Sequence, residues 1–346
     1  MTRPTPAPAP AVAEDVAWFR IAEPSAVGAA RRAAMQLAGR LGFTDGRTGE
    51  VGIAVTEAGT NLIKHATEGS LLLRAVRHDT GAMVEFLAVD SGPGMPDMDV
   101  AVQDGHTTTG TLGIGLGAIY RLADAWDAYS APARGTVLVA GFGDRRTGGW
   151  SGASSPPLVE GLTRPMTGEE VCGDGFAVRR TGHGLQVLLC DGLGHGPLAA
   201  RATQEALRLF MSCAATDPVG VLKTLHRGLS HTRGVAAAIA DLDPAARRVR
   251  FAGIGNISAA VVAERRRGMI SAPGIVGHQL PRVQEYQYDL PAGSPVVLHS
   301  DGLQDRWDFA AYPGLARHRP LTVAATLLRD AGLRRDDASV VVAKVD

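Results

Sequence analysis

The pattern of apolar and polar residues divides the chain into two unlike halves. In the first half, apolar residues recur every three to four positions in three stretches, which predicts three helices. Runs that favour extended structure predict three strands, with a turn at 79–81 between the first two. The helices are expected at 25–41, 49–66 and 115–125, and the strands at 71–76, 83–89 and 136–141. This half is therefore expected to form helices around a sheet.

The second half contains more strands than the first. Strands are expected at 175–180, 185–190, 235–241, 248–254, 258–263, 296–300 and 339–345, and helices at 197–213, 218–229 and 321–331. Because many strands come with few intervening helices, this half is expected to form stacked sheets flanked by helices. The predicted fold class is α+β.

A polar segment separates the two halves. Residues 144–157 are rich in Gly, Ser and Pro and lack periodicity, which is typical of a linker. The chain has 346 residues, and at about 150 residues per domain this length predicts two domains. We expect a disordered Pro/Ala-rich tail at 1–12, a first domain at 13–143, a linker at 144–157 and a second domain at 158–346.

Composition excludes several classes of protein. Lys plus Arg and Asp plus Glu both number 35, so the chain has no excess positive charge with which to bind nucleic acid. No apolar run reaches the roughly 18 residues of a membrane span, and the N-terminus lacks the hydrophobic core of a signal peptide. Three cysteines are too few for a disulfide framework, which fits a reducing compartment. We therefore expect a cytoplasmic protein with no membrane partner.

Three polar motifs of the first half can serve nucleotide chemistry. Glu57 and Asn61 lie four residues apart on an expected helix, so they share a face that can hold hydrated Mg²⁺ or simply be solvated. Asp90 follows a strand and can accept a hydrogen bond from an exocyclic amine such as that of adenine, or form an ordinary Asp/Gly turn. The glycine-rich run 110–117 precedes a helix, where free backbone N–H groups can bind phosphate.

Together these motifs resemble the ATPase fold shared by gyrase, histidine kinases and MutL, the GHKL or Bergerat α/β sandwich. Two segments look like the sequences of the RsbT-type switch kinases: Val55-Thr-Glu-Ala-Gly-Thr-Asn-Leu-Ile-Lys-His-Ala66 and residues 113–124. Those kinases phosphorylate Ser or Thr on STAS-domain antagonist proteins. The resemblance implies that ATP and Mg²⁺ are bound. It implies Glu57 as catalytic base, Asn61 as Mg²⁺ ligand, Asp90, Gly92 and Gly94 at adenine, Gly113, Gly115 and Gly117 at the phosphates, and Lys64 near phosphate charge.

Four acidic positions stand out in the second half. Asp191 and Asp301 each end an apolar strand, Asp174 follows a glycine, and Asp336-Asp337 precedes a strand. Carboxylates brought together from distant strand ends are suited to two metal ions, which need several hard oxygen ligands. Taken singly, each Asp-Gly pair is equally a common turn signal.

The set resembles the SpoIIE and RsbX subclass of metal-dependent (PPM) serine/threonine phosphatases, which are αββα sandwiches that use Mn²⁺ or Mg²⁺. The most specific motif in this resemblance is Cys190-Asp-Gly-Leu-Gly-His-Gly-Pro-Leu-Ala-Ala200. By this resemblance a water between the metals is the nucleophile. The implied ligands are Asp191, which bridges two metals, the Gly192 carbonyl, Asp174, Asp301, and Asp336 in preference to Asp337, with Asp191 and Asp301 counted as catalytic.

Two further residues were weighed beside this set. His195 can donate a proton to the leaving serine oxygen or merely occupy the turn before a helix. Gly255-Asn256 is interpreted as a turn between two strands.

The combined hypothesis is a bifunctional partner-switching regulator in bacterial sigma-factor or stress signalling. Its first domain phosphorylates, and its second domain dephosphorylates, Ser or Thr on STAS-domain antagonist or scaffold proteins. Two alternatives remain open: a phosphatase whose first domain only senses nucleotide, and a module that binds a sigma factor or an antagonist.

Overall fold

The chain forms two compact units, residues 1–157 and 158–346, and each is considered by itself. This computed structural model describes residues 12–78, 81–98, 100, 115–147, 158–280 and 282–345. The expected tail, apart from Val12, and most of the expected linker therefore lie outside the described residues, as does Gly113.

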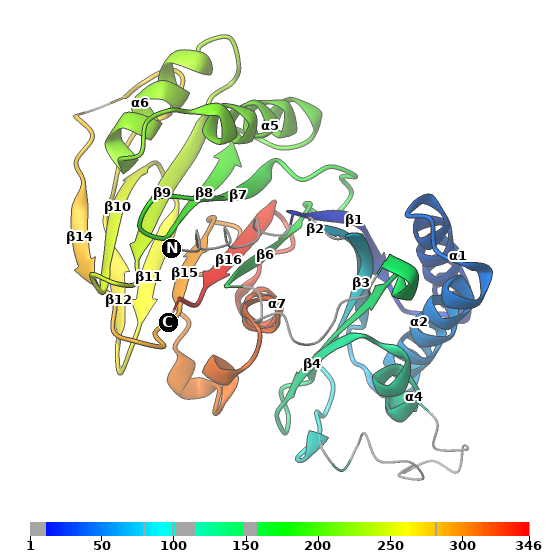
Figure 1. Cartoon of the computed structure of the whole chain (residues 1–346). Coiled ribbons are helices and arrows are strands. Elements are labelled where there is room, and N and C mark those ends of the chain that lie inside the picture. The colour runs from blue at the N-terminus through cyan, green and yellow to red at the C-terminus, as the bar shows by residue number, and fades with distance from the viewer. Residues whose placement is uncertain are drawn as a thin grey trace, which may run out of the picture. The chain divides into compact units, whose positions relative to one another are not determined.

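The first unit is an antiparallel sheet with helices against one face (Figure 1). The strands run in the order β1-β2-β3-β5-β4. Their bounds are β1 Val12–Arg20, β2 Ser70–His78, β3 Gly81–Val89, β4 Ala125–Ser130 and β5 Thr136–Gly143. The helices are α1 Pro24–Arg40, α2 Asp45–His65 and α4 Gly115–Leu122. A short 3-10 helix, η1, spans Arg145–Thr147.

The helices are amphipathic, and their apolar stripes form the core of this unit with the sheet. On α2, Val51, Val55, Ala58 and Leu62 recur at helical spacing and are buried. They pack in one cluster with strand residues such as Leu73 and Phe86. The helix begins at a good cap, because the Thr44 side chain accepts a hydrogen bond from the Arg47 backbone N–H.

Arg47 is a buried cation that connects the start of α2 to the ends of α4 and β5. Its side chain is only 5% exposed and forms ion pairs with Asp124 and Glu50. It also donates hydrogen bonds to the backbone oxygens of Gly143, at 3.0 Å, and Leu122, at 2.8 Å. One guanidinium group thereby holds the end of α4 and the end of β5, and its single positive charge is paired with two carboxylates.

We predict that Arg47→Met lowers the free energy of unfolding of the first domain by about 3–5 kcal/mol, since it leaves buried acceptors without a donor. Chemical denaturation followed by circular dichroism measures this change. Arg40→Ala, an exposed arginine at the end of α1, is the matched control and should cost less than about 1 kcal/mol. Equal losses in the two variants would contradict the assigned role of Arg47.

The second unit contains two stacked sheets. One has the order β13-β10-β9-β8-β7, with β14 paired to β10, and the other has the order β12-β11-β15-β16-β6. The bounds of the first sheet are β7 Asp174–Arg180, β8 Leu185–Gly192, β9 Val235–Asp243, β10 Arg248–Ile254, β13 Ser271–Ala272 and β14 Tyr286–Asp289. Those of the second are β6 Val159–Arg164, β11 Ser258–Val262, β12 Arg266–Met269, β15 Val296–His299 and β16 Ala338–Ala343.

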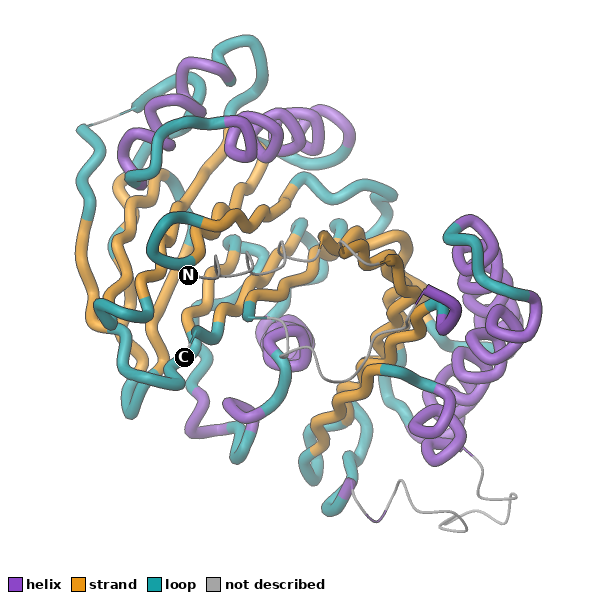
Figure 2. Tube along the Cα trace, viewed as in Figure 1, coloured by secondary structure: helices purple, strands orange, loops and turns teal. Residues whose placement is uncertain are grey.

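In the second unit, helices cover the outer face of each of the two sheets (Figure 2). The helices α5 Pro197–Ser212 and α6 Pro218–Gly228 pack on the first sheet, and α7 Pro320–Ala331 packs on β6 and β16 of the second. Short 3-10 helices lie at Phe309–Ala311 and Leu315–Arg317. Strand β16 is buried on both faces, so its sequence is a continuous apolar run rather than an alternation. The layers are helix, sheet, sheet and helix.

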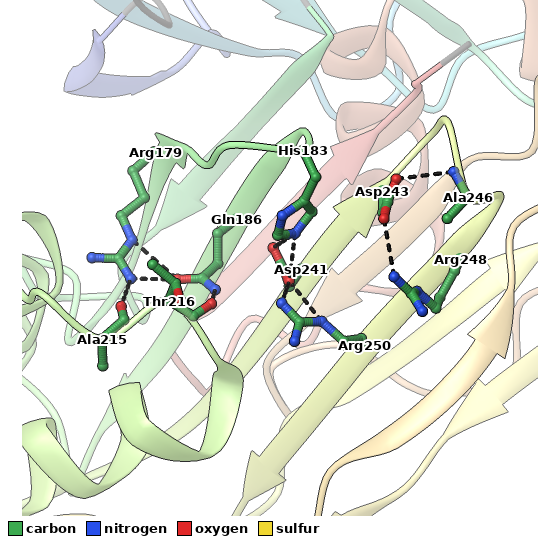
Figure 3. Close-up of polar contacts among 10 residues, drawn as sticks. All are labelled: Arg179, His183, Gln186, Ala215, Thr216, Asp241, Asp243, Ala246, Arg248 and Arg250. Atoms are coloured by element: carbon green, nitrogen blue, oxygen red, sulfur yellow. Dashed lines mark hydrogen bonds and ion pairs between the residues drawn. The ribbon is translucent and has the colours of Figure 1, made fainter.

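A buried polar network closes the end of the first sheet where β8 begins (Figure 3). Arg179 and Asp241 both lie across from Gln186 in the strand register. Arg179 donates hydrogen bonds to Gln186 Oε1 and to backbone oxygens after α5, including that of Ala215 at 2.5 Å. The buried Asp241 carboxylate accepts hydrogen bonds from Arg250, and His183 Nε2 lies 2.9 Å from it. This network fixes the sheet end opposite the one where β8 reaches Asp191.

The structure corrects the expected elements at several points. The third helix of the first unit ends at Leu122, not at 125, because Asp124 binds the Gly143 backbone N–H and the Arg47 side chain. The chain then enters β4, which the sequence did not predict. Strand β1 was missed and begins at Val12, which had been assigned to the tail. Strands β6, β12, β13 and β14 were also missed, and most of them are very short.

Two features of the described residues bear on the expectations from composition. None of their helices has the length and apolar character needed to cross a lipid bilayer. Cys172, Cys190 and Cys213 are all free thiols.

Candidate functional site

In the first unit, three of the predicted motifs meet at one end of the helical layer. Asn61, on the last turns of α2, lies against Gly115, the first residue of α4. A Cβ added to Gly115 would be only 3.3 Å from Asn61 Nδ2. Glu57 lies half-buried one turn earlier on the same helix, and Lys64 is exposed near its end. Gly115 thus allows α4 to begin directly beside the Asn61 amide.

The Asp90 turn lies against the end of α2. Asp90 ends β3, and its Oδ1 accepts a hydrogen bond of 2.7 Å from the Gly92 backbone N–H. A Cβ on Gly92 would lie 2.6 Å from the carbonyl oxygen of His65. Gly94 has φ +68°, and a Cβ there would lie 2.0 Å from the carbonyl oxygen of Ala131. Both glycines are therefore required by close approach of the backbone.

Of the glycines expected at the phosphates, the structure describes Gly115 and Gly117, which are the first and third residues of α4. Gly117 is buried within the helix. Gly113 and residues 101–114 lie outside the described part of the chain. A nucleotide at this end of the unit would meet Asn61 and Asp90 from neighbouring elements.

In the second unit, acidic residues from both sheets gather at one end of the sandwich. Asp174 and Asp191 lie directly across from each other in the register of β7 and β8. Ser300 connects this pair to the other sheet, since its Oγ donates a 2.5 Å hydrogen bond to Asp174 Oδ2 and accepts one from the Ser339 backbone N–H. Asp301 follows Ser300.

The structure separates the two adjacent aspartates before β16. Asp337 is buried, and its carboxylate accepts hydrogen bonds of 2.8 Å from the backbone N–H groups of Met166 and Gly173. Asp336 is half-buried, and burial first, then the neighbouring Asp301 charge, raise the pKa of its carboxyl. Asp337 thus fixes two loops, while Asp336 faces the acidic cluster.

Burial and like charge act together on the cluster. Burial first, and then the neighbouring Asp301 and Asp336 carboxylates, raise the pKa of Asp191 to about 7. Burial and the Asp191 charge hold the pKa of Asp174 well above its usual range. The carboxylates of the cluster therefore repel one another when they are all ionised.

The donor set fits divalent cations of the Mg²⁺ and Mn²⁺ kind. These ions prefer carboxylate and carbonyl oxygens, and Asp174, Asp191, Asp301, Asp336 and the Gly192 carbonyl supply only such atoms. In the described ranges, no three Asp, Glu, His or Cys side chains already converge as a ready-made ligand set. The carboxylates are instead held by hydrogen bonds to neutral groups, and a cation would relieve their mutual repulsion.

Asn256 is a site residue that sequence reasoning missed. It was assigned to a turn, and the turn is present between β10 and β11, with Gly255 at φ +94°. Its Nδ2 donates a 2.6 Å hydrogen bond to Asp301 Oδ2, and its hydrogen bond to Asp191 opposes the rise in the pKa of that residue. A single amide therefore contacts two carboxylates from different sheets.

His195 lies at the entrance to the cluster. Its Nδ1 is 2.8 Å from Glu169 Oε1, and its side chain is 56% exposed. Its charge opposes the rise in the pKa of Asp336. The Glu169 contact orients the ring. His195 therefore occupies the turn before α5, and this position does not exclude a role as proton donor.

Comparison with known protein families identifies both halves. Residues 21–142 match the histidine kinase-like ATPase domain, and residues 181–346 match stage II sporulation protein E (SpoIIE). The serine/threonine-protein kinase RsbT of Bacillus subtilis (strain 168) is 30% identical over 126 residues, which are 36% of this chain and 95% of RsbT. The chain belongs to the RsbT family. RsbT matches only 36% of the chain, and the half that matches SpoIIE is a second, additional part.

Two further relatives are similar to parts of the chain. The phosphoserine phosphatase RsbX of the same Bacillus strain is 24% identical over 139 residues, covering 39% of this chain and 69% of RsbX. A solved structure described under the bacterial stressosome, a modular system adapted to control secondary messenger signalling, is 31% identical. It covers 54% of this chain and 98% of its own, with a TM-score of 0.49. With the topology above, the family matches confirm the predicted fold class: a GHKL-type unit followed by a PPM-type αββα sandwich.

We predict that Asn256→Ala lowers the affinity of the second domain for Mn²⁺ about 10–100-fold, because Asp301 and Asp191 lose the amide that orients them. Isothermal titration of the full chain with Mn²⁺ measures this affinity. Ser258→Ala, two residues further along, is the matched control and should leave the affinity unchanged. Unaltered Mn²⁺ binding by the Asn256 variant would remove this residue from the site.

Proposed function

We propose that the second domain removes phosphate from serine or threonine of a protein, with two Mn²⁺ or Mg²⁺ ions held by the acidic cluster. The observation that carries this proposal is the meeting of Asp174, Asp191, Asp301 and Asp336 from two sheets, close enough for their charges to act on one another. The membership of residues 181–346 in the SpoIIE family and the similarity to the phosphoserine phosphatase RsbX support it.

The residues of this chain would divide the work as follows. Asp174, Asp191, Asp301, Asp336 and the Gly192 carbonyl would hold the two metal ions, and Asn256 would orient two of the carboxylates. When bound, the ions supply Lewis acidity toward water and the phosphoryl group. His195, whose Nδ1 lies 2.8 Å from Glu169 Oε1, would give a proton to the leaving serine oxygen. No covalent phospho-enzyme is required.

We predict that the wild-type chain hydrolyses an aryl phosphate only in the presence of Mn²⁺ or Mg²⁺, and that Asp301→Asn lowers kcat by about 100-fold or more. The loss is expected because one ligand charge disappears, and the release of p-nitrophenol measures it. Asp289→Asn is a matched control, since Asp289 is 92% exposed and lies across from Arg248, at the end of the first sheet away from the cluster. A metal-loaded, folded protein without any hydrolysis would favour a binding module instead.

We further propose that the first domain binds ATP with Mg²⁺ and phosphorylates serine or threonine on a STAS-domain antagonist or scaffold protein. The position of Asn61 beside the start of α4 and the Asp90 turn at the end of α2 support nucleotide binding. The 30% identity to the kinase RsbT supports transfer to a protein. Glu57 would act as base toward the attacking hydroxyl. The chain would then be a cytoplasmic partner-switching regulator that both adds and removes phosphate.

A nucleotide sensor and a kinase differ in what Glu57 does. We predict that Glu57→Gln keeps ATP affinity but lowers phosphate transfer about 10²–10⁴-fold, since a general base contributes on that order. Transfer of labelled phosphate from ATP to a STAS-domain protein measures the rate, and Asn61→Ala is expected to lose ATP binding as well. Ile53→Ala, an exposed residue of the same helix, is the control. Wild-type protein that binds ATP without transfer would point to the sensor.

A further inference from the structure

A pocket of about 270 Å³ adjoins the acidic cluster on the side of strands β11 and β12. Asn256 belongs to both places, because it lines the pocket and its Nδ2 donates the 2.6 Å hydrogen bond to Asp301 Oδ2. Asp305, four residues after Asp301, also lines the pocket. A group that fills this pocket would therefore lie beside the carboxylates that are suited to hold metal ions.

A glycine in strand β12 leaves this pocket open. Gly268 pairs with Ala260 of β11 in a regular antiparallel ladder, and a Cβ added to Gly268 would meet no other part of the described chain within 4 Å. Arg266, two residues earlier, extends from the same side of the strand, because strand side chains alternate. A glycine weakens a strand and often marks the place where a ligand or another backbone comes close. The position of Gly268 thus provides space that the described residues do not fill.

The two charged side chains of the pocket are already paired with each other. Arg266 donates a 2.6 Å hydrogen bond to the Asp305 carbonyl oxygen and forms an ion pair with the Asp305 carboxylate. Its guanidinium carbon lies 4.2 Å from the centre of the Trp307 ring. Within the described part of the chain, the half-buried Ser258 hydroxyl of the pocket has no hydrogen-bond partner. The pocket therefore suits an uncharged side chain with a polar end, because a further charge would enter without a partner.

The volume of the pocket limits what can occupy it. It is several times the roughly 30 Å³ that one water molecule takes in the liquid, so more than a single water fits. It is also smaller than the roughly 300–1,000 Å³ of pockets that hold drug-sized molecules. One amino-acid side chain matches this size, and a neighbour of a phosphorylated residue bound at the cluster would be able to reach it.

We propose that this pocket binds an uncharged, polar side chain that lies within a few residues of the phosphorylated serine or threonine, and so contributes to the choice of protein substrate. This inference rests on the proposed phosphatase function of the neighbouring cluster. Gly268 would leave room for the side chain, and the Ser258 hydroxyl would hydrogen bond to its polar end. The pocket would act on peptide and protein substrates, and not on a small aryl phosphate that has no such side chain.

The test compares wild type, Gly268→Ala and Gly268→Val in the full chain with Mn²⁺. The substrates are p-nitrophenyl phosphate and three phosphoserine peptides, which carry glutamine, glutamate or glycine at the positions on both sides of the phosphoserine. Wild type is expected to have its highest kcat/KM among the peptides for the glutamine peptide. Gly268→Val fills the pocket and should lower the ratio of kcat/KM for the glutamine peptide to that for p-nitrophenyl phosphate about 10-fold or more.

Two controls separate filling of the pocket from damage to the fold. Gly268→Ala adds a smaller side chain and should cause a smaller loss, and the glycine peptide should show no relative loss in either variant. Gly182→Val is the matched control, because Gly182 also has open space around it and lies between β7 and β8, at the end of the first sheet away from the cluster. This variant should keep the wild-type ratio.

An unchanged ratio in Gly268→Val would overturn the proposal, and so would an equal loss with all four substrates, which indicates a structural role. Wild-type protein that hydrolyses the glutamate or the glycine peptide as well as the glutamine peptide would also overturn it. If the wild type hydrolyses no phosphate ester, the proposed function fails separately, and calorimetric titration of the Mn²⁺-loaded chain with the glutamine peptide decides the inference. Binding weakened by Gly268→Val but not by Gly182→Val would then sustain it, and binding that is absent or unaffected would overturn it.

Discussion

The second domain is organised around the repulsion between carboxylates at the end of its two sheets. Ser300 holds the sheets in contact there, with one hydrogen bond to Asp174 and another from the Ser339 backbone. The Ser300 hydroxyl and the Ser339 backbone N–H are neutral groups, so they position the charge of the cluster but do not cancel it. A fold with this arrangement gains when a divalent cation binds, because the cation replaces repulsion by attraction. The packing of the two sheets would therefore be linked to the binding of a metal ion at this cluster.

Close backbone approach explains why glycine follows the aspartates of both domains. A Cβ on Gly302 would lie 1.9 Å from the Asp337 carbonyl oxygen, and one on Gly192 would lie 2.5 Å from that of Ala199. In the first domain Gly94, four residues after Asp90 and not directly beside it, is also required by a close backbone contact. An Asp-Gly pair is usually taken as a turn, but at these positions the glycine lets a second segment contact the backbone beside the carboxylate.

The sequence predicted the long periodic helices and the buried strands, since burial of one stripe or of both faces leaves a readable pattern. It failed where the decisive contact lies far away in the chain. Asp124 ends α4 through Gly143 and Arg47, and β1 is a strand because β2 lies beside it. Asn256 has no motif of its own, and only the fold brings it to Asp301. The aspartates were visible because they recur at strand ends, whereas a lone amide in a turn gives no such signal.

Charge in the second domain is divided by position. Asp241 is buried against Arg250, so opposite charges cancel at the end of the sheet away from the cluster. At the other end the cluster is held by the Ser300 hydroxyl and the Asn256 amide, which are neutral groups. If an arginine held these carboxylates instead, a metal ion could bind only by displacing it. Because neutral groups fix them, a divalent cation could join these carboxylates without breaking an ion pair to the groups that hold them.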